Sequence, residues 1–122
     1  MVPVLISWTD PAEDPRLAGQ TVGVGGSLRL ETSGPTGFEK PKSVYVTGTI
    51  SLDGPQFAEI PSANEASKVA IIKHELGHLL GLNHVDDPMQ LMHKETKDVG
   101  TYANGDLNGL ANLGTGDCFP YL

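Results

Sequence analysis

The stretch SANEASKVAIIKHELGHLLGLNH, residues 62–84, decides the fold of this chain. Apolar side chains recur in it at the three- and four-residue spacing of one helix face. These apolar positions are Val69, Ile72, Leu76, Leu79 and Leu80. Ser62 and Glu65 have the spacing of a capping box, and Gly81 stands where a helix commonly ends in a left-handed conformation. We therefore expect a helix over residues 62–80 that ends at Gly81.

Three of the four histidines of the chain, His74, His78 and His84, fall within the last eleven residues of this stretch. His74 and His78 are four residues apart, so their rings project from one helix face on successive turns. Gly81 lets the chain turn sharply after the helix, which can bring His84 back to the same point. Three histidines that leave one coordination position open are a ligand set of catalytic zinc sites. The sequence therefore predicts one catalytic Zn2+ ion.

Glu75 follows His74 and is offset by about 100° around the helix, so it can point at the metal site without being a ligand. A zinc ion lowers the pKa of a bound water to about 7, and Glu75 would accept its proton and later pass it to the leaving amine. One alternative is a binding module that keeps zinc for structure and does not cleave, although such a module would not need Glu75. Another is a zinc hydrolase of small amides or esters.

The remaining elements are shorter. Three segments alternate between apolar and polar residues or are rich in β-branched side chains, which predicts strands over residues 2–8, 20–31 and 43–52. The second segment forms either one strand or two strands broken at Gly25-Gly26. A second helix is expected to begin near Asn104 or Asp106 and to end at Gly114. Strands first and helices later indicate an α+β fold, with a small twisted, mainly N-terminal sheet packed on the active-site helix.

Composition limits the class of protein. The 122 residues suit one domain over residues 1–122, and 15 glycines and 9 prolines predict many loops. Eight basic against 15 acidic residues argue against nucleic-acid binding. No apolar run approaches the ~20 residues of a membrane span, and the first residues lack the features of a signal peptide. Cys118 is the only cysteine, so no disulfide can form within the chain.

The segment 74–84 resembles the motif H-E-x-x-H-x-x-G-x-x-H of metzincin peptidases at all five defining positions. Gln90-Leu91-Met92-His93 is similar to the Met-turn of that family, which implies that Met92 lies beneath the metal ligands and that Gly81 supports the site. Residues 105–110 resemble the start of the C-terminal helix in the matrixin branch, which includes the matrix metallopeptidases. There an aspartate at the position of Asp106 supports the Met-turn.

The resemblance implies a zinc metalloendopeptidase of the EC 3.4.24 type, an extracellular location and protein or peptide substrates. It also implies that an edge strand within residues 20–30 pairs with extended substrate. Metzincins normally carry a long helix between their first two strands. No amphipathic helix precedes Ser62, so either this segment lacks that helix at its N-terminal side or the fold is a reduced version.

Tyr102 is a candidate oxyanion group but suits packing better, and Asp53 and Glu59 do not support a calcium site. Oligomeric state and cleavage preference are not determined by the sequence.

Overall fold

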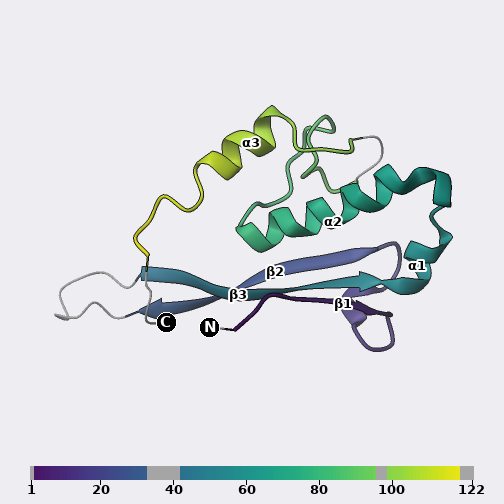
Figure 1. Cartoon of the computed structure of the whole chain (residues 1–122), viewed down its shortest axis with the longest axis horizontal. Helices are drawn as coiled ribbons and strands as arrows, with labels where there is room; N and C mark the ends of the chain where they lie inside the picture. The colour runs from purple at the N-terminus through teal and green to yellow at the C-terminus, as the bar shows by residue number, and fades with distance from the viewer. Residues whose placement is uncertain (1, 33–41, 96–98, 119–122) are drawn as a thin grey trace.

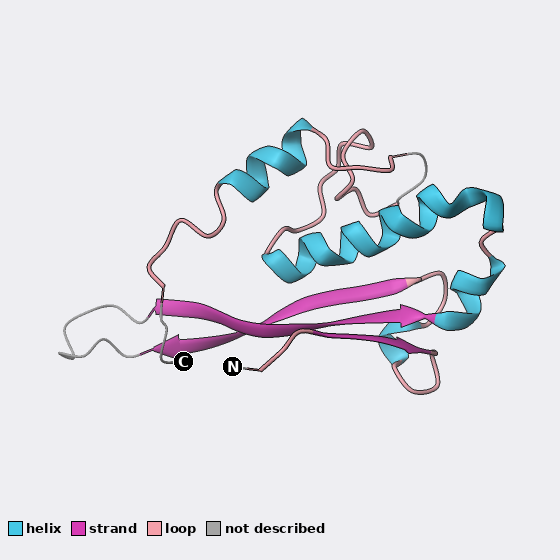
Figure 2. Ribbon diagram, viewed as in Figure 1, coloured by secondary structure: helices cyan, strands magenta, loops and turns pink. Residues whose placement is uncertain are grey.

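The protein is described as a computed structural model over residues 2–32, 42–95 and 99–118 (Figures 1 and 2). Three strands come first and three α-helices follow, which confirms the predicted α+β class. The elements are β1 (Leu5–Thr9), β2 (Gly23–Thr32), β3 (Lys42–Asp53), α1 (Gly54–Glu59), α2 (Glu65–Leu80) and α3 (Asn104–Ala111), with short 3-10 helices at Pro15–Leu17 and Ser62–Asn64.

The three strands form one sheet in the order β1-β3-β2. The central strand β3 pairs with β1 in parallel and with β2 in antiparallel fashion, so β2 lies at an edge. Of the two possibilities left open by the sequence, one strand or two strands broken at Gly25-Gly26, the structure shows one strand, because both glycines keep their backbone pairing with β3. The irregularity lies instead between Leu28 and Arg29. Thus β2 is one continuous ten-residue edge strand.

Helix α2 lies along one face of the sheet and packs against β2 and β3 (Figure 1). Beneath it Ile50, Leu52 and Phe57 form the buried cluster of the core. Half-buried side chains that pack against this cluster are Val22, Ile71, Ile72 and Leu79. Ile50 and Leu52 alternate along β3, so both point to the face that α2 covers.

Only two of the five apolar positions predicted for α2 pack against the core. Ile72 and Leu79 contact the core, and Ile71 joins them from outside the predicted stripe. The other three members of the stripe are exposed, namely Val69, Leu76 and Leu80. The sheet covers only one side of the helix, so the far part of the stripe faces solvent.

The two ends of α2 differ in how well the sequence predicts them. The predicted capping box is wrong, because Asn64 is the N-cap residue and no side chain caps it. Ser62 lies two residues too early, in the short 3-10 helix that precedes α2. At the C-terminal end Gly81 adopts φ 116° and donates its N–H to the carbonyl oxygens of Gly77 and His78, which confirms the predicted end.

The short helix α1 was not predicted, because the sequence interpretation ended the third strand at residue 52 and found no amphipathic helix before Ser62. The Asp53 carboxylate caps this helix by accepting from the Gln56 backbone N–H at 3.0 Å and from its side-chain amide at 2.7 Å. Asp53 therefore has a structural partner and belongs to a helix cap. Over the described residues that precede Ser62, α1 and the 3-10 helix at Pro15–Leu17 are the only helical segments.

Helix α3 begins at Asn104, one of the two predicted starts, and ends at Ala111, three residues before Gly114. It lies beyond α2 as seen from the sheet (Figure 2). None of the helices in the described residues has the length and apolar character that a membrane crossing requires.

Candidate metal centre

The rings of His74, His78 and His84 converge on one point. The Nε2 atom of His74 lies 3.0 Å from that of His84 and 3.1 Å from that of His78, and the third pair is also 3.1 Å apart. Ligands 2.0–2.1 Å from a tetrahedral zinc ion would be separated by about 3.3 Å. The three nitrogens therefore fit one zinc ion. They are the only group of three or more potential metal-ligating side chains found among the described residues.

Backbone carbonyl groups fix the tautomers of the two helical histidines. Nδ1 of His74 donates to the carbonyl oxygen of Leu91 at 2.7 Å, and Nδ1 of His78 donates to that of Leu82 at 2.8 Å. A carbonyl oxygen can only accept, so the hydrogen resides on Nδ1 and each Nε2 keeps a free lone pair. Such hydrogen bonds to the far ring nitrogen are typical of metal-binding histidines.

Burial also favours the metal-binding form of the His74 and His84 rings. Loss of solvent lowers the pKa of His74, and the neighbouring histidines lower it further against the opposing hydrogen bond to Leu91. The pKa of His84 is lowered mainly by burial and then by the charge of His78. A lowered pKa favours the neutral imidazole, which is the metal-binding form.

The turn at Gly81 and the backbone that follows it place His84. The N–H of Leu82 donates to the carbonyl of Gly77 at 2.9 Å, which closes the end of α2. The N–H of Val85 then donates to the carbonyl of Met92 at 3.1 Å. His84 is therefore held between the end of the helix and the following turn.

Met92 lies under the helix that carries the first two histidines. It is 1% exposed, and its sulfur lies so close to Gly77 that any Cβ at that position would overlap it. Gly77 sits on the turn of α2 between His74 and His78, so Met92 packs below both.

Asp106, at the start of α3, holds the turn that carries Met92. Its buried carboxylate accepts from the backbone N–H groups of Leu91 at 2.7 Å, Met92 at 3.1 Å and Ala103 at 2.8 Å. Leu91 also provides the carbonyl that orients His74. One carboxylate is thus linked through the turn to a metal-ligand candidate.

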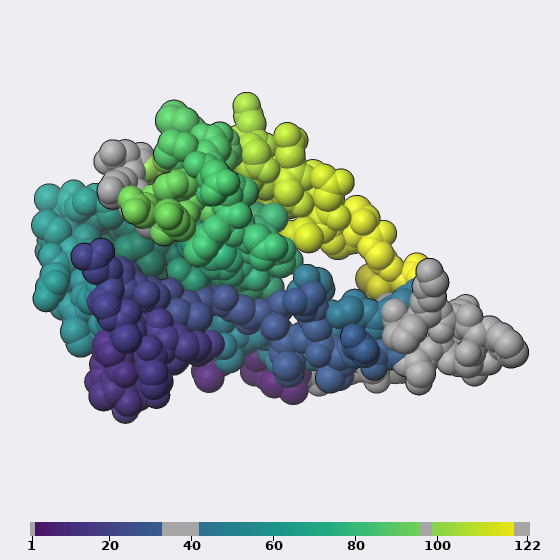
Figure 3. All heavy atoms as spheres, turned by 180° about the vertical axis from the view of Figure 1, so that it is seen from behind, coloured from purple at the N-terminus to yellow at the C-terminus, as the bar shows by residue number. Residues whose placement is uncertain are grey.

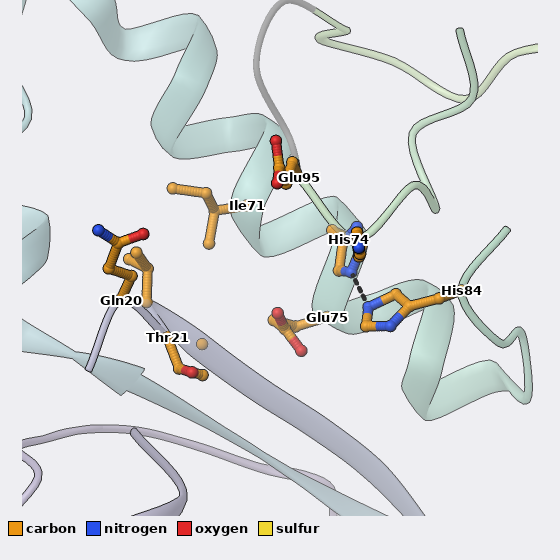
Figure 4. Close-up of a pocket in the computed structure, with 10 residues that line it drawn as sticks. Gln20, Thr21, Ile71, His74, Glu75, His84 and Glu95 are labelled. Atoms are coloured by element: carbon orange, nitrogen blue, oxygen red, sulfur yellow. Dashed lines mark hydrogen bonds between the residues drawn. The ribbon is translucent and has the colours of Figure 1, made fainter. Parts of the chain in front are cut away.

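Glu75 is 6% exposed and lies between α2 and the edge strand β2. Burial raises the pKa of its carboxyl, against lowering by the charge of His78 and by a backbone hydrogen bond from Gly25. Glu75 lines a cavity of about 390 Å³ beside His74 and His84 (Figure 4). It therefore adjoins the histidine cluster without being part of it.

The walls of this cavity come from three segments. The start of β2 and the residues before it form one wall, α2 forms the second, and the segment after Met92 forms the third. In Figure 3 the start of β2 and the segment after α2 lie near each other on one face. The lining residues outside the histidine motif are Gln20, Thr21, Val22, Gly23, Ile71, Lys94 and Glu95. These cavity walls were not predicted, apart from the edge strand.

Three further polar residues have structural partners. The Tyr102 hydroxyl donates to the carbonyl oxygen of Lys73 at 2.6 Å, which ties Tyr102 to α2 and agrees with the packing role favoured by the sequence. Nδ1 of His93 accepts from the Glu95 backbone N–H. Gln90, which the sequence interpretation missed, accepts from Gly105 and Asp106 N–H groups at 2.8 and 3.1 Å. Its position beside the Met-turn was the only feature of the sequence that could have indicated this structural role.

The fold and the convergent histidines form a candidate metal centre of the kind found in metallopeptidases. The sequence profile of the matrixin family of peptidases matches residues 13–113, which is most of the chain. The chain therefore belongs to the matrixin family. No curated protein and no solved structure matches it significantly.

Proposed function

We propose that the chain is a zinc-dependent endopeptidase in which His74, His78 and His84 hold the metal and Glu75 is the general base. The observation that carries this proposal is the convergence of three Nε2 atoms within 3.1 Å, with a buried carboxylate beside them. When bound, a zinc ion would polarise the peptide carbonyl and acidify the attacking water.

The surroundings of Glu75 suit proton transfer in both directions. Its raised pKa brings the carboxyl closer to neutral pH, which increases its ability to accept a proton and keep it until the leaving amine takes it. Because Glu75 is almost fully buried, few bulk water molecules can compete for that proton. Glu75 therefore acts first as base on the attacking water and then as acid on the amine.

The edge of β2 and the adjoining cavity suit a polypeptide substrate. An extended peptide can add to the free edge of β2 by backbone hydrogen bonds, with little dependence on its sequence. The cavity of about 390 Å³ beside Glu75 is large enough for one substrate side chain next to the cleaved bond. A strand-like binding edge favours a peptidase over a hydrolase of small amides or esters. The extracellular location implied by the family forms part of the same proposal.

The test compares the wild type, Glu75→Gln and the chelated wild type on a broad peptide library, with zinc measured in each. We expect one zinc per chain in the wild type and in Glu75→Gln. The variant should lose about 10²- to 10⁴-fold in kcat, which is the usual contribution of a general base. Chelation should abolish cleavage and added zinc should restore it.

Three outcomes contradict the proposal in different ways. Equal cleavage by the wild type and Glu75→Gln would exclude the base assignment. A fully zinc-loaded wild type that cleaves nothing in the library would favour the non-catalytic binding module. Cleavage of small esters or amides without any peptide cleavage would favour the small-substrate hydrolase.

A further inference from the structure

Strand β2 approaches α2 so closely at Glu75 that two of its positions have room only for glycine. A Cβ added at Gly23 would lie 2.8 Å from Cγ of Glu75 and 3.1 Å from its Oε1. A Cβ added at Gly25 would overlap the backbone carbonyl oxygen of Glu75 and lie 2.9 Å from its carbonyl carbon. The two glycines are two residues apart on one strand, so both face the helix.

This close approach brings backbone polar groups to the carboxyl of Glu75. The backbone N–H of Gly25 is one of the groups that lower the pKa of this carboxyl. A side chain at Gly23 or Gly25 would occupy the space that Glu75 now fills, because both added Cβ atoms would meet Glu75 as their nearest neighbour. The glutamate is therefore confined between its own helix and the backbone of the edge strand.

The glycines have no corresponding role at the histidines. The rings of His74 and His78 are oriented by the carbonyl groups of Leu91 and Leu82, which lie on other segments. The atoms nearest to an added Cβ at Gly23 or Gly25 all belong to Glu75, and none belongs to a histidine. Metal binding and the position of the carboxylate are thus held by different contacts.

We propose that Gly23 and Gly25 are positioning residues for the general base, since they set the spacing of β2 and α2 that fixes the Glu75 carboxylate. The inference rests on the proposed function of Glu75. Glycine inside a strand weakens the strand, so alanine would be favoured at both positions if sheet stability alone mattered. The spacing has a catalytic consequence because a small displacement of a catalytic group can strongly reduce the rate.

The chain offers a matched control at Gly26, in the same strand and next to Gly25. No atom lies within 4 Å of a Cβ added there, so Gly26→Ala makes the same chemical change in open space. We therefore compare Gly23→Ala, Gly25→Ala and Gly26→Ala as zinc-loaded full chains. The measurements are kcat and KM on one peptide substrate, bound zinc, and the midpoint of thermal unfolding.

We expect Gly23→Ala to lower kcat by about 10- to 100-fold, with KM within about twofold of wild type and full zinc content. Gly26→Ala should keep a kcat clearly above that of Gly23→Ala, and its unfolding midpoint should equal or exceed that of the wild type. Gly25→Ala should show the larger loss of kcat and a lower unfolding midpoint, because its Cβ would meet backbone atoms. Since Gly25→Ala can fail to fold, Gly23→Ala carries the test: its nearest neighbours are atoms of a side chain.

One result overturns this inference but leaves the proposed function intact: the wild type cleaves peptides, and Gly23→Ala and Gly26→Ala have the same kcat. Loss of zinc from Gly23→Ala would also overturn it, because the effect would then belong to metal binding. A zinc-loaded wild type without any peptide cleavage overturns the proposed function, and this inference with it.

Discussion

At the scale of single residues, the buried carboxylate of Asp106 has the largest number of structural partners near the site. It accepts three backbone N–H groups, two of them from the turn that carries Met92. A carboxylate can accept up to about four hydrogen bonds, whereas a side-chain amide offers only one acceptor oxygen. Asp106 therefore connects the start of α3 with the floor of the metal centre.

Asp106→Asn should lower the free energy of unfolding by about 2–3 kcal/mol, because at least one buried N–H loses its acceptor. Urea denaturation of the zinc-loaded protein measures this loss. Asp87→Asn is the matched control, since the Asp87 carboxylate accepts from the Met89 N–H and the Gln90 amide at an exposed position. Water can replace those partners, so the control should change little. Equal effects of the two substitutions would show that burial of Asp106 is not the cause.

At the scale of secondary-structure elements, the sequence predicted what depends on local periodicity. It gave the type of all three strands and the C-terminal end of α2, because apolar spacing and the glycine after the helix are local signals. It missed α1 because Gly54-Pro55, at the start of this helix, is more typical of a turn. Proline is tolerated in the first turn of a helix, and Asp53 supplies the cap.

The candidate site shows the same division between local and tertiary information. The three histidines and Glu75 were predicted because their spacing on one helix and its following turn is local. The cavity wall at Lys94 and Glu95 was not predicted, because it depends on where the segment after Met92 lies relative to α2 and β2. The sequence also left open whether residues 20–31 form one strand or two, because the answer depends on tertiary contacts: the sheet pairs both Gly25 and Gly26, and the approach to Glu75 requires the small size of Gly25.

Gly81→Ala tests whether the end of α2 places His84. Gly81 has φ 116°, which strains any residue with a Cβ, and the added Cβ would lie 2.8 Å from the Tyr45 hydroxyl oxygen. The strained turn should move His84 away from the two helical histidines. We expect zinc affinity to fall by about 10-fold or more, measured by competition with a chromophoric chelator.

Gly114→Ala provides the control for that substitution. Gly114 also has a positive φ, of 69°, but no atom lies within 4 Å of its added Cβ and it follows α3 instead of the metal motif. The Gly114→Ala protein should lose about 1 kcal/mol of unfolding free energy from backbone strain, and its zinc affinity should be unchanged. If the two variants lost zinc affinity equally, the placement of His84 would not depend on the turn at Gly81.

At the scale of the whole molecule, the candidate metal centre rests on buried apolar residues. Leu91 and Met92, from the turn beneath the histidines, are among the few fully buried apolar residues of the described chain. A chain of this length buries a modest share of its surface, so its core alone gives limited stability. A zinc ion held by His74, His78 and His84 would connect α2 with the loop after it. Zinc binding should therefore stabilise the fold.

This coupling predicts a pH-dependent gain in stability from zinc. Burial lowers the pKa of His74 and His84 below the ordinary value of 6.5, so the unfolded chain binds more protons than the folded chain below that pH. The stability contributed by these neutral rings is complete above pH 6.5 and is lost as pH falls through the lower folded-state pKa values. Protons also compete with zinc for the same nitrogens, so the stabilisation by zinc should be lost over the same range.

The measurement is the unfolding midpoint between pH 8 and pH 5, with saturating zinc and with a chelator. Subtracting the two curves largely removes the opposite contribution of Glu75, whose raised pKa makes stability fall as pH rises above 4.5. The difference should be largest at pH 7–8 and small at pH 5. His84→Gln should reduce it strongly, whereas His93→Gln should leave it unchanged, because His93 lies outside the cluster. A difference that stays constant from pH 8 to pH 5 would mean that zinc is not held by titrating imidazoles.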